Sequence, residues 1–265
     1  MELRDRVIVI TGGGSGIGAA MARRFAAEHP AAIVLADVDV QGARSVASSI
    51  GPIATATSCD VSDGAAVHAL IASVVEAHGH VDLFCSNAGI ATGKGLEADD
   101  AAWTRIWDIN VMASVHAAQA LVALATPETP VHLLITSSAA GLLTNLGDAP
   151  YTATKHAAVG LAEWLAVTHT DDGLHTSCLC PQGVRTPLVM SGLEEGQLAA
   201  SVVEAMGLIE PEQCAEAVME GLTNGTFLIL PHPEVATYQR AKVESPEKWI
   251  GSMRKLQARL LRSQR

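Results

Sequence analysis

Short apolar runs alternate with longer amphipathic stretches through most of the chain. Most of these runs are apolar throughout, which is typical of strands buried on both faces of a parallel sheet. The stretches between them repeat their apolar residues with a helical period. Strands are predicted over Val7–Ile10, Ile33–Ala36, Ile53–Thr57, Val81–Cys85, Val131–Ser137, 174–180 and Phe227–Leu230. Helices are predicted to about Glu28 after the first strand, near 40–50, over Asp63–His78 and 99–124, from Tyr151 to about Thr168, and over 211–223.

This alternation predicts a doubly wound α/β fold, in which one parallel sheet is flanked by helices on both faces. We expect a single domain over residues 1–233, since no linker, repeat or low-complexity stretch divides it. Residues 188–209 interrupt the alternation and are predicted to be a mobile lid insertion. Residues 234–265 are predicted to form a basic amphipathic tail that belongs to the same unit.

The tail carries an apolar stripe. Trp249, Met253, Leu256 and Leu260 fall on one helical face, and the segment 240–265 holds eight Lys or Arg against two acidic residues. Such a stripe docks on the protein's own core, on a neighbouring subunit or on a membrane surface. The first two alternatives are favoured, and no membrane partner is expected.

The composition indicates a soluble globular protein, because 49% of its 265 residues are hydrophobic and only 3% are aromatic. A formal net charge of −11 argues against nucleic acid as a partner, since phosphate binding needs a basic face. The five cysteines lack metal-type spacing and mostly lie in or beside apolar runs, which indicates reduced thiols in a cytoplasmic protein. The charged N-terminus and the absence of a bilayer-length apolar run agree with that location. The ten histidines are scattered, so no metal site is expected.

A glycine cluster, Thr11–Gly18, follows the first predicted strand and opens the first predicted helix. Glycines in this position permit a tight turn and let backbone N–H groups approach a pyrophosphate at the helix N-terminus. Glycine-rich turns are common, but the position between a buried strand and a helix favours a dinucleotide site. Asp37 ends the second strand, where a carboxylate binds the adenosine ribose and repels a 2′-phosphate. No Arg or Lys lies in the turn or just after Asp37, so NAD is expected rather than NADP.

Tyr151 and Lys155 lie one helical turn apart on the same helical face. A lysine ammonium beside a phenol favours the phenolate, so we expect the pKa of Tyr151 to lie below its reference value of about 10. Such a tyrosine suits general acid–base catalysis between an alcohol and a carbonyl. The spacing alone is weak support, because Tyr and Lys occur four residues apart on many helices.

Together these motifs resemble those of the short-chain dehydrogenase/reductases. The resemblance rests on the TGxxxGIG turn Thr11–Gly18, on Ser86–Gly89, on Asn110 and Ser138, and on the YxxxK pair, and it covers roughly residues 5–230. It implies a Rossmann fold, a nicotinamide cofactor and hydride transfer to or from a carbinol carbon.

The resemblance implies a role for each matching position. Tyr151 would be the general acid/base at the substrate oxygen, Lys155 would lower its pKa and bind the nicotinamide ribose, and Ser138 would hold the substrate oxygen. Asn110 would hold a water in a proton relay that reaches Lys155. The cofactor would be contacted by Gly12, Ser15, Gly16, Ile17, Gly18, Asp37, Asp60, Val61, Asn87, Ala88, Gly89, Tyr151, Lys155, Pro181, Val184 and Thr186.

Within this set, the resemblance places Asp60–Val61 at the adenine, Asn87–Gly89 beside the adenosine ribose, and Val184 with Thr186 at the nicotinamide carboxamide. Taken singly, each position has a structural alternative. Thr186, for example, precedes Pro187 and could be only a turn residue. Together and in the family's order, the positions favour the functional interpretation.

Two positions depart from the pattern of the family. Ser86 stands where Asn is usual, which is expected to cost one local hydrogen bond. Gln182 stands where Gly is usual, directly after Pro181. Its side chain is expected to lie close to the nicotinamide and to affect cofactor fit or substrate access.

The walls of a substrate pocket are expected from Ile90–Leu96, Ala139–Pro150 and 188–209. Their apolar side chains predict a secondary alcohol or ketone on an apolar carbon frame, although the same side chains could instead pack beneath the lid. These side chains are Leu142, Leu143, Leu146, Leu188, Val189, Met190 and Leu193.

The leading hypothesis is an NAD-dependent oxidoreductase that interconverts a small-molecule secondary alcohol and ketone, and the preference for NAD favours oxidation. One alternative is an NAD-binding regulator without turnover, against which the intact set of four predicted catalytic residues argues. Another is an extended-type sugar-nucleotide epimerase or dehydratase. The chain is short for that class, and three residues separate Gly12 from Gly16 where the class has two.

A homotetramer, or a dimer, is expected to form through the helices at 99–124 and 151–168. Small residues on these helices permit close approach of a second subunit, although alanines also suit packing on the sheet. The small residues are Ala117, Ala118, Ala153, Ala157, Ala158 and Gly160.

Overall fold

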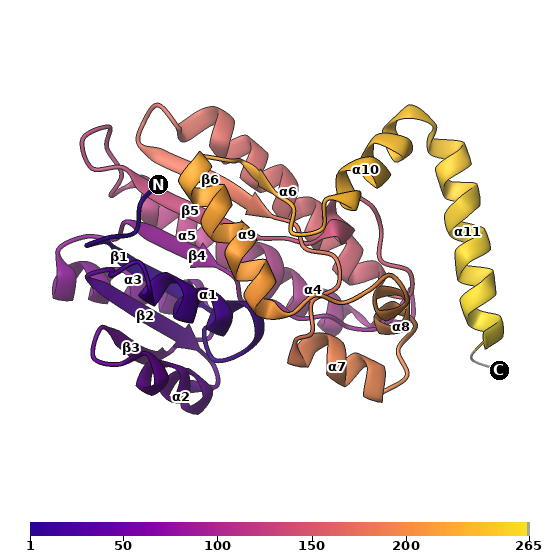
Figure 1. The fold of residues 1–265 in the computed structure, drawn as a ribbon, viewed down its shortest axis with the longest axis horizontal. Helices are drawn as coiled ribbons and strands as arrows, with labels where there is room; N and C mark the ends of the chain where they lie inside the picture. The colour runs from indigo at the N-terminus through magenta and orange to yellow at the C-terminus, as the bar shows by residue number, and fades with distance from the viewer. Residues whose placement is uncertain (264–265) are drawn as a thin grey trace.

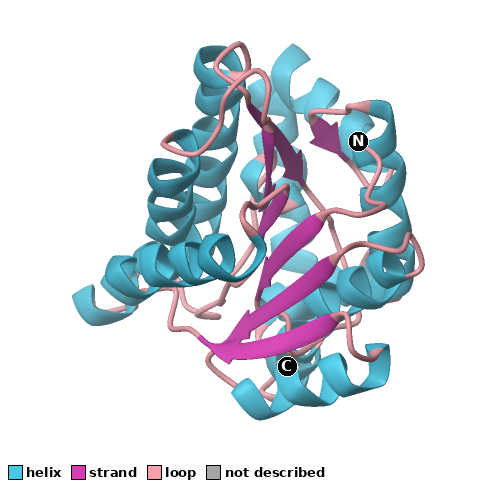
Figure 2. Ribbon diagram, turned by 90° about the vertical axis from the view of Figure 1, so that its left-hand side faces the viewer, coloured by secondary structure: helices cyan, strands magenta, loops and turns pink. Residues whose placement is uncertain are grey.

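The computed structural model describes residues 1–263, and its strands form one parallel sheet in the order β3-β2-β1-β4-β5-β6-β7. Helices cover both faces of this sheet (Figures 1 and 2). The doubly wound α/β architecture predicted from the sequence is therefore confirmed. The strands are β1 (Val7–Thr11), β2 (Ala32–Asp37), β3 (Ala54–Ser58), β4 (Leu83–Ser86), β5 (Val131–Thr136), β6 (Leu174–Leu179) and β7 (Leu228–Ile229).

The central strand β1 shows why these runs are apolar throughout. Successive side chains of a strand point to opposite faces of the sheet. Val7 and Val9 pack into the core on one face, whereas Ile8 and Ile10 pack into the core on the other. All four are at most 2% exposed, so a polar residue at any of them would be buried.

On each face of the sheet, one group of helices packs against the strands and completes the core. The core that contains Ile8 and Ile10 also contains residues of α1 (Gly16–Ala26), α2 (Val40–Ile50) and α9 (Pro211–Asn224). The opposite core contains residues of α3 (Gly64–His78), α5 (Ala113–Val122) and α6 (Ala149–His169).

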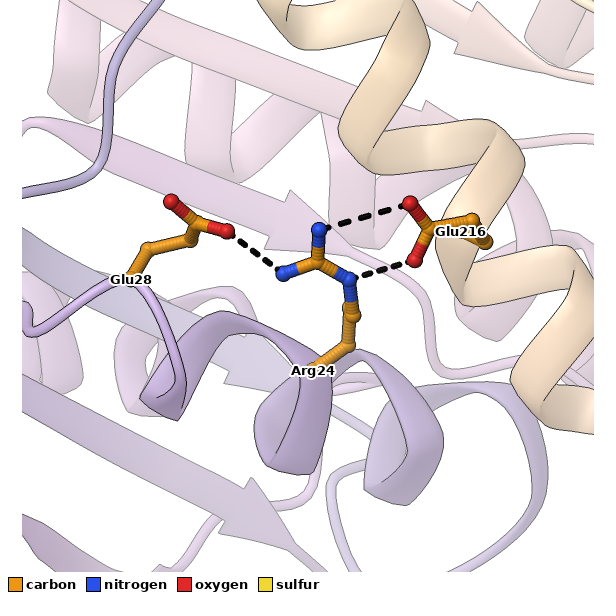
Figure 3. A network of polar contacts seen from close by, with 3 residues as sticks. All are labelled: Arg24, Glu28 and Glu216. Carbon is orange, nitrogen blue, oxygen red and sulfur yellow. Dashed lines mark hydrogen bonds and ion pairs between the residues drawn. The ribbon is translucent and has the colours of Figure 1, made fainter.

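A surface ion-pair network joins α1 to α9 (Figure 3). Arg24 on α1 donates Nε and Nη2 to the carboxylate of Glu216 on α9, and donates Nη1 to Glu28 at 2.7 Å. Exposed pairs of this kind contribute at most about 1 kcal/mol each. The stronger link between α1 and α9 is therefore apolar, because both helices contribute buried residues to the core that contains Ile8 and Ile10.

The structure differs from the expected elements in two places. The long helix predicted at 99–124 is divided into α4 (Asp100–Trp107), the π-helical turn η1 (Asp108–Met112) and α5. A π turn inserts one extra residue into the helical ladder, and the apolar periodicity of a sequence does not reveal it.

The predicted insertion 188–209 folds into two short helices, α7 (Pro187–Glu194) and α8 (Leu198–Ala205). Thr186 is the N-cap of α7 and Pro187 occupies its first turn, which suits proline because that position needs no N–H donor. The segment is therefore largely helical, and its mobility stays a prediction.

After β7 the chain leaves the sheet and forms α10 (Glu234–Glu244) and α11 (Pro246–Ser263) at the far edge of the molecule (Figure 1). The tail predicted at 234–265 is helical over both of these segments, and its residues 264–265 lie outside the described residues. Within residues 1–263, no helix has both the length and the apolarity needed to cross a bilayer.

The small residues expected at a subunit interface divide between core and surface. Ala117, Ala118 and Ala158 are buried within this chain's own core, so they are not available to a second subunit. Ala157 is partly buried and Gly160 is exposed. The alternative of packing on the sheet therefore holds for the first three residues.

Candidate active site

The carboxyl ends of β1 and β4 lie side by side at the point where the strand order reverses. In doubly wound sheets the connections from such a pair diverge to opposite faces and leave a crevice between them. The predicted glycine turn follows β1, and the predicted Asn87–Gly89 segment follows β4. The fold therefore brings these two segments to one crevice.

The turn after β1 requires glycine at two positions. Gly12 has a φ of +64°, which side-chain-bearing residues rarely adopt. A Cβ on Gly18 would lie 2.1 Å from the backbone oxygen of Gly12, so only glycine lets α1 start this close to β1. In the described chain, Ser15 at the N-cap of α1 makes no side-chain cap hydrogen bond. The first N–H groups of α1 are therefore oriented toward the crevice for an anionic ligand.

Asp37 at the end of β2 holds the glycine turn from one side. Its Oδ2 accepts a hydrogen bond from the N–H of Gly14 at 2.9 Å, and its Oδ1 accepts one from Asp39 at 2.9 Å. A side chain at Gly14 would collide with this carboxylate, because a Cβ there would lie 2.9 Å from Oδ2. Asp37 thus contributes both a negative charge to the crevice and a backbone contact that shapes the turn.

Thr11 and Asn87 connect β1 with the segment after β4. The Thr11 hydroxyl accepts the N–H groups of Asn87 at 3.0 Å and Ala88 at 3.2 Å, and it donates to the backbone oxygen of Cys85. The Asn87 amide donates to the backbone oxygens of Thr11 and Gly12. This network fixes Asn87, Ala88 and the glycine turn as one rigid wall.

Asp60 and Arg105 lie farther along the same crevice. Hydrogen bonds from the side chain and backbone of Ser62 lower the pKa of Asp60, and the charge of Arg105 acts in the same direction. Arg105 lines the crevice from α4 and was not expected from the sequence. Its position in a helix far along the chain carries no local signal of this placement.

Asn110 occupies the π turn η1 and is 4% exposed. Its Oδ1 accepts the N–H of Ile90 at 2.9 Å, and its Nδ2 donates to the backbone oxygen of Ile90 at 2.9 Å and to Thr154 Oγ1 at 3.2 Å. Both Nδ2 hydrogens are therefore engaged. The side chain ties the loop after β4 to α6, which explains a polar residue inside a helix.

Ser138 follows β5 and shapes the short 3₁₀ turn η2 (Ala139–Gly141). Its hydroxyl accepts the N–H of Ala140 at 3.1 Å and donates to the backbone oxygen of Pro181 at 3.4 Å. The neighbouring Ser137 donates to the backbone oxygen of Lys155 at 2.9 Å. The two serines thus attach the end of β5 to the loop after β6 and to α6.

Asp148 organises the start of α6, and the sequence interpretation did not include it. It is 1% exposed and caps α6 by accepting the N–H of Tyr151 at 3.0 Å. It also accepts hydrogen bonds from both the N–H and the hydroxyl of Thr92 and from the N–H of Gly93. An Asp followed by Pro150 in the first turn is a recognisable N-cap signal, but nothing local indicates the contacts to residues 92–93.

Tyr151 and Lys155 project from α6 into the crevice, and the Lys155 ammonium lies 5.4 Å from the centre of the Tyr151 ring. Lys155 is 3% exposed, and its Nζ donates to the backbone oxygen of Thr136 at 3.0 Å. The pair therefore has the proximity that the four-residue spacing predicts.

The lowered pKa expected for Tyr151 is not found. Burial raises the pKa of this phenol to about 12, while a hydrogen bond with Ser138 acts in the opposite direction and the charge of Asp148 adds to the rise. Burial also lowers the pKa of Lys155 to about 8. In the protein by itself, the cost of burying charge on both groups outweighs the attraction between ammonium and phenolate. Tyr151 is therefore a neutral proton donor at pH 7.

His232 stabilises the loop after β6 by two hydrogen bonds to its backbone. Its Nδ1 accepts the N–H of Gln182 at 3.1 Å, so its Nε2 carries the proton and donates to the backbone oxygen of Gly183 at 3.1 Å. His232 is 4% exposed, and burial lowers its pKa, which keeps the ring neutral. The amide oxygen of Gln182 is buried and has no hydrogen-bond partner within residues 1–263.

A cavity of about 320 Å³ follows the crevice. It collects every predicted cofactor contact except Gly18, which packs behind the turn against Gly12. Ser138 also lines this cavity, whereas Asn110 lies behind its wall. The predicted residues that line it are Gly12, Ser15, Gly16, Ile17, Asp37, Asp60, Val61, Asn87, Ala88, Gly89, Tyr151, Lys155, Pro181, Val184 and Thr186.

A second cavity of about 370 Å³ adjoins the first. Five residues line both cavities and mark the junction between them: Ser138, Tyr151, Gln182, Leu188 and Val189. Most of the remaining wall is aliphatic and comes from the predicted regions 139–150 and 188–209. A hydrophobic pocket that opens beside two hydroxyl groups suits an apolar molecule with one polar oxygen at its end.

Of the seven apolar side chains expected in this wall, Leu143, Leu188 and Val189 line the second cavity. Leu142 instead belongs to the main core and is 7% exposed. Four further residues were not expected here: Trp249, Ser252 and Met253 of α11, and Tyr238 of α10. The apolar stripe of the tail was visible in the sequence, but its position over this cavity depends on the tertiary fold.

The substitution of Ser86 for the usual Asn has a local explanation. The Ser86 hydroxyl lies 2.8 Å from the hydroxyl of Ser114 on α5, and both residues are buried. The predicted loss of a hydrogen bond is therefore compensated within the core.

The first cavity fits a dinucleotide cofactor. Gly12 and Gly16 line it, and a Cβ at Gly12 would collide with the Cα of Ala88 at 2.9 Å, whereas one at Gly16 would lie 3.1 Å from Thr186. The glycines therefore leave room for a ligand backbone at the start of α1, and the Asp37 carboxylate lies at one side of that space. Within residues 1–263, no cluster of His, Cys, Asp or Glu is arranged to hold a metal ion.

Comparison with known proteins identifies the family of this chain. The sequence model of the family described as "short chain dehydrogenase" matches residues 6–196. The chain is 36% identical over 230 residues to meso-2,3-butanediol dehydrogenase of Serratia marcescens, covering 84% of this chain and 89% of that protein. It is 33% identical over 188 residues to (+)-borneol dehydrogenase 1 of Salvia officinalis, covering 70% of this chain and 72% of that protein.

The sex determination protein tasselseed-2 of Zea mays is also related, at 33% identity over 206 residues. That match covers 74% of this chain but only 60% of the length of tasselseed-2. Among solved structures, a short-chain dehydrogenase/reductase from Burkholderia phymatum in complex with NAD superposes with a TM-score of 0.83 at 29% identity. The superposition covers 93% of this chain and 96% of that chain. This chain belongs to the short-chain dehydrogenase/reductase family.

Proposed function

We propose that this protein is an NAD-preferring oxidoreductase that interconverts a secondary alcohol and a ketone on an apolar carbon frame. The observation that carries the proposal is the junction of the two cavities. Tyr151 and Ser138 line both of them, so a molecule in either cavity meets the same two hydroxyl groups. A bound nicotinamide in the first cavity would supply or accept a hydride.

Tyr151 acts as the general acid/base in this proposal. In the reducing direction its phenol donates a proton to the carbonyl oxygen, and in the oxidising direction it takes the proton back from the alcohol. Burial raises its pKa to about 12, so the phenol holds its proton for the reducing direction. The oxidising direction needs the phenolate, which the neighbouring Lys155 ammonium stabilises. Ser138 is hydrogen-bonded with Tyr151 and holds the same substrate oxygen.

Lys155 and Asn110 support proton exchange at the Tyr151 hydroxyl without contacting the substrate. The Lys155 ammonium is held against Thr136 and stabilises negative charge on the Tyr151 oxygen when the proton leaves. Asn110 holds the π turn against Ile90, and π turns leave backbone groups outside the regular ladder. We assign the water of the predicted relay to this turn, since both Nδ2 hydrogens of Asn110 are engaged elsewhere.

Asp37 supports the preference for NAD. Its carboxylate lines the first cavity, where it could accept hydrogen bonds from a ribose hydroxyl and would repel a 2′-phosphate. We predict that Asp37→Asn lowers the ratio of kcat/KM for NAD to that for NADP by about tenfold or more, since loss of one charge repulsion of about 1.4 kcal/mol changes affinity tenfold. Asp39→Asn is the matched control, because Asp39 caps α2 two residues away and does not line the cavity. An unchanged ratio in Asp37→Asn would refute this assignment.

The second cavity supports an apolar substrate. Its largely aliphatic walls favour a hydrocarbon frame, and the hydroxyl groups of Ser138 and Tyr151 lie at its junction with the first cavity. Two relatives bear the names of dehydrogenases of alcohols, borneol and 2,3-butanediol. They differ greatly in size, so the cavity rather than the relatives argues for a bulky substrate.

A substrate screen tests the proposal. Secondary alcohols of increasing size are incubated with NAD and, in parallel, with NADP, and reduced cofactor is followed by its absorbance. We expect turnover with NAD for at least one alcohol that has an apolar ring. Cofactor binding without turnover across alcohols and ketones would instead favour an NAD-binding regulator.

A further inference from the structure

Lys242 on α10 makes contacts that an ordinary surface lysine does not make. Its Nζ donates to the backbone oxygens of Leu142 at 2.8 Å and Leu143 at 3.0 Å, and it lies 3.4 Å from Nε2 of His156. Leu142 and Leu143 directly follow the 3₁₀ turn η2, whose N-cap is Ser138. One ammonium thus attaches the C-terminal segment to the loop beside the proposed active site.

The His156 ring has the tautomer that this contact needs. Its Nδ1 lies 2.9 Å from the backbone oxygen of Thr152, which can only accept, so Nδ1 carries the proton. Nε2 is then unprotonated and accepts a hydrogen bond from Lys242. An ammonium has three N–H donors, and all three of Lys242 are engaged.

The same ammonium positions an aromatic ring of α11. Lys242 Nζ lies 5.3 Å from the centre of the Trp249 ring, which is the range of a cation–π contact. Burial lowers the pKa of Lys242, in agreement with an ammonium that is partly removed from water. Trp249 is therefore fixed through Lys242 to the loop at 142–143 and to α6.

Trp249 and Met253 lie one turn apart on α11, and both line the second cavity. Tyr238 lines it from α10, and Leu143 lines it from the loop that Lys242 holds. α11 packs beside α8, whose Val202 and Val203 also face this cavity. Side chains of α10 and α11 thus form part of the wall of the second cavity, and Figure 1 shows both helices at the edge of the molecule.

We propose that residues Glu234–Ser263 form a cap over the substrate cavity, that Lys242 latches this cap to the loop at 142–143 and to α6, and that Trp249 and Met253 select substrates with a bulky apolar frame. The cap rests on the proposed function, because it assigns the second cavity to the substrate. Lys242 is a positioning residue, and Trp249 is a specificity-determining residue.

The latch is tested without any substrate. Hydrogen exchange of the full-length protein is compared between wild type, Lys242→Met and Lys255→Met. Lys242→Met keeps an apolar stem but removes the ammonium. Lys255→Met removes the same charge from an exposed lysine of α11 and is the matched control. We expect Lys242→Met to speed exchange of α11 and of residues 142–143 by about tenfold or more while the sheet is unchanged. Unchanged exchange of α11 in Lys242→Met would overturn the latch.

Selection is tested by binding in the presence of NAD, since a ketone and an oxidised cofactor cannot react with each other. The probes are camphor, a bicyclic ketone, and acetone. We expect Trp249→Leu to weaken camphor binding about tenfold and to leave acetone binding unchanged, because the lost apolar contact is worth about 1.4 kcal/mol. Ile250→Ala is the control on the same helix, because Ile250 is 51% exposed and does not line the cavity.

These experiments distinguish a failure of the cap proposal from a failure of the proposed oxidoreductase activity. Equal weakening of both ketones in Trp249→Leu, or no camphor binding by the wild type, would overturn the selection role of the cap. If camphor binds as expected but no alcohol is ever turned over, the cap stands and the proposed oxidoreductase activity fails.

Discussion

At the scale of single residues, the most informative group is the buried ammonium of Lys155. Burial lowers its pKa from the usual 10.5 to about 8, although the charged form donates to Thr136. A group whose pKa falls on folding destabilises the native state wherever its charged form persists. The protein therefore carries a stability cost at the position that the proposed chemistry requires.

We predict that Lys155→Met raises the free energy of unfolding at pH 7 by about 1–2 kcal/mol and abolishes turnover. The pKa difference corresponds to about 3 kcal/mol, and the lost hydrogen bond to Thr136 offsets about 1 kcal/mol of it. Between about pH 8 and 10.5 the unfolded chain holds more protons than the native protein, so wild-type stability rises with pH in this window.

Urea unfolding of both proteins from pH 7 to pH 10.5 measures this difference. The stability advantage of Lys155→Met should shrink as the pH rises above 8, because the native wild-type protein then sheds its buried charge. A variant that is less stable than the wild type at pH 7 would contradict the account.

At the same scale, the sequence predicted which residues form the site better than it predicted the burial and the hydrogen-bond partners of those residues. The positions of Tyr151, Ser138 and Asp37 follow from motif spacing, and the structure brings them to one crevice. The direction of the Tyr151 pKa shift was wrong, because spacing reports the neighbouring lysine but not the burial of the phenol. The tertiary partners of Asp148 and Lys242 were equally invisible, since they lie 55 and 100 residues away.

At the scale of elements, α6 is the helix whose start decides the geometry of the site. Three other helices, α2, α3 and α4, also begin at an Asp N-cap, and in each the cap accepts from one backbone N–H of its own helix. Asp148 caps α6 and also accepts three hydrogen bonds from Thr92 and Gly93. It thereby sets the position of Tyr151 relative to the loop after β4.

We predict that Asp148→Ala lowers the free energy of unfolding by about 2–4 kcal/mol, because it removes a cap and leaves buried donors unpaired. Asp63→Ala, which removes the exposed cap of α3, should cost only about 1 kcal/mol. Urea unfolding gives both values. Equal costs for the two variants would show that the contacts to residues 92–93 contribute nothing.

The strands were predicted well from the sequence, whereas the π turn and the two short helices of the insertion were not. Strands were predicted within a few residues because their apolar runs are continuous. The π turn at Asp108–Met112 was missed, since Asn110 is placed there by its contacts with Ile90 rather than by a local preference. The helices α7 and α8 were missed because short helices in a lid lack a long apolar period.

At the scale of the whole molecule, the outer face of α6 is unusually apolar for a free surface. Trp164 is 57% exposed and Val167 is 85% exposed, and both lie near the end of this helix. Ala157 and Gly160 on the same helix are partly or fully exposed. Exposed apolar side chains gathered on one helix mark a surface that another protein chain covers.

We predict a homotetramer in which α6 meets α6 of a second subunit. Light scattering coupled to size exclusion should give a mass four times that of the 27.5 kDa chain. Val167→Glu should lower this mass, because a buried unpaired charge disfavours the interface by several kcal/mol. The exposed Val243 of α10 gives the control Val243→Glu, which should leave the mass unchanged. A monomer in the wild-type protein would contradict this assembly.

The most direct test of the central claim is the turnover of Tyr151→Phe on the best alcohol from the screen. Removing one hydroxyl should lower kcat by about 10²–10⁴-fold, the usual contribution of a general acid/base, while the Kd for NADH changes by less than about threefold. Retained cofactor binding excludes a folding defect. Turnover within about tenfold of the wild-type rate would contradict the assignment of Tyr151 as the proton donor and acceptor.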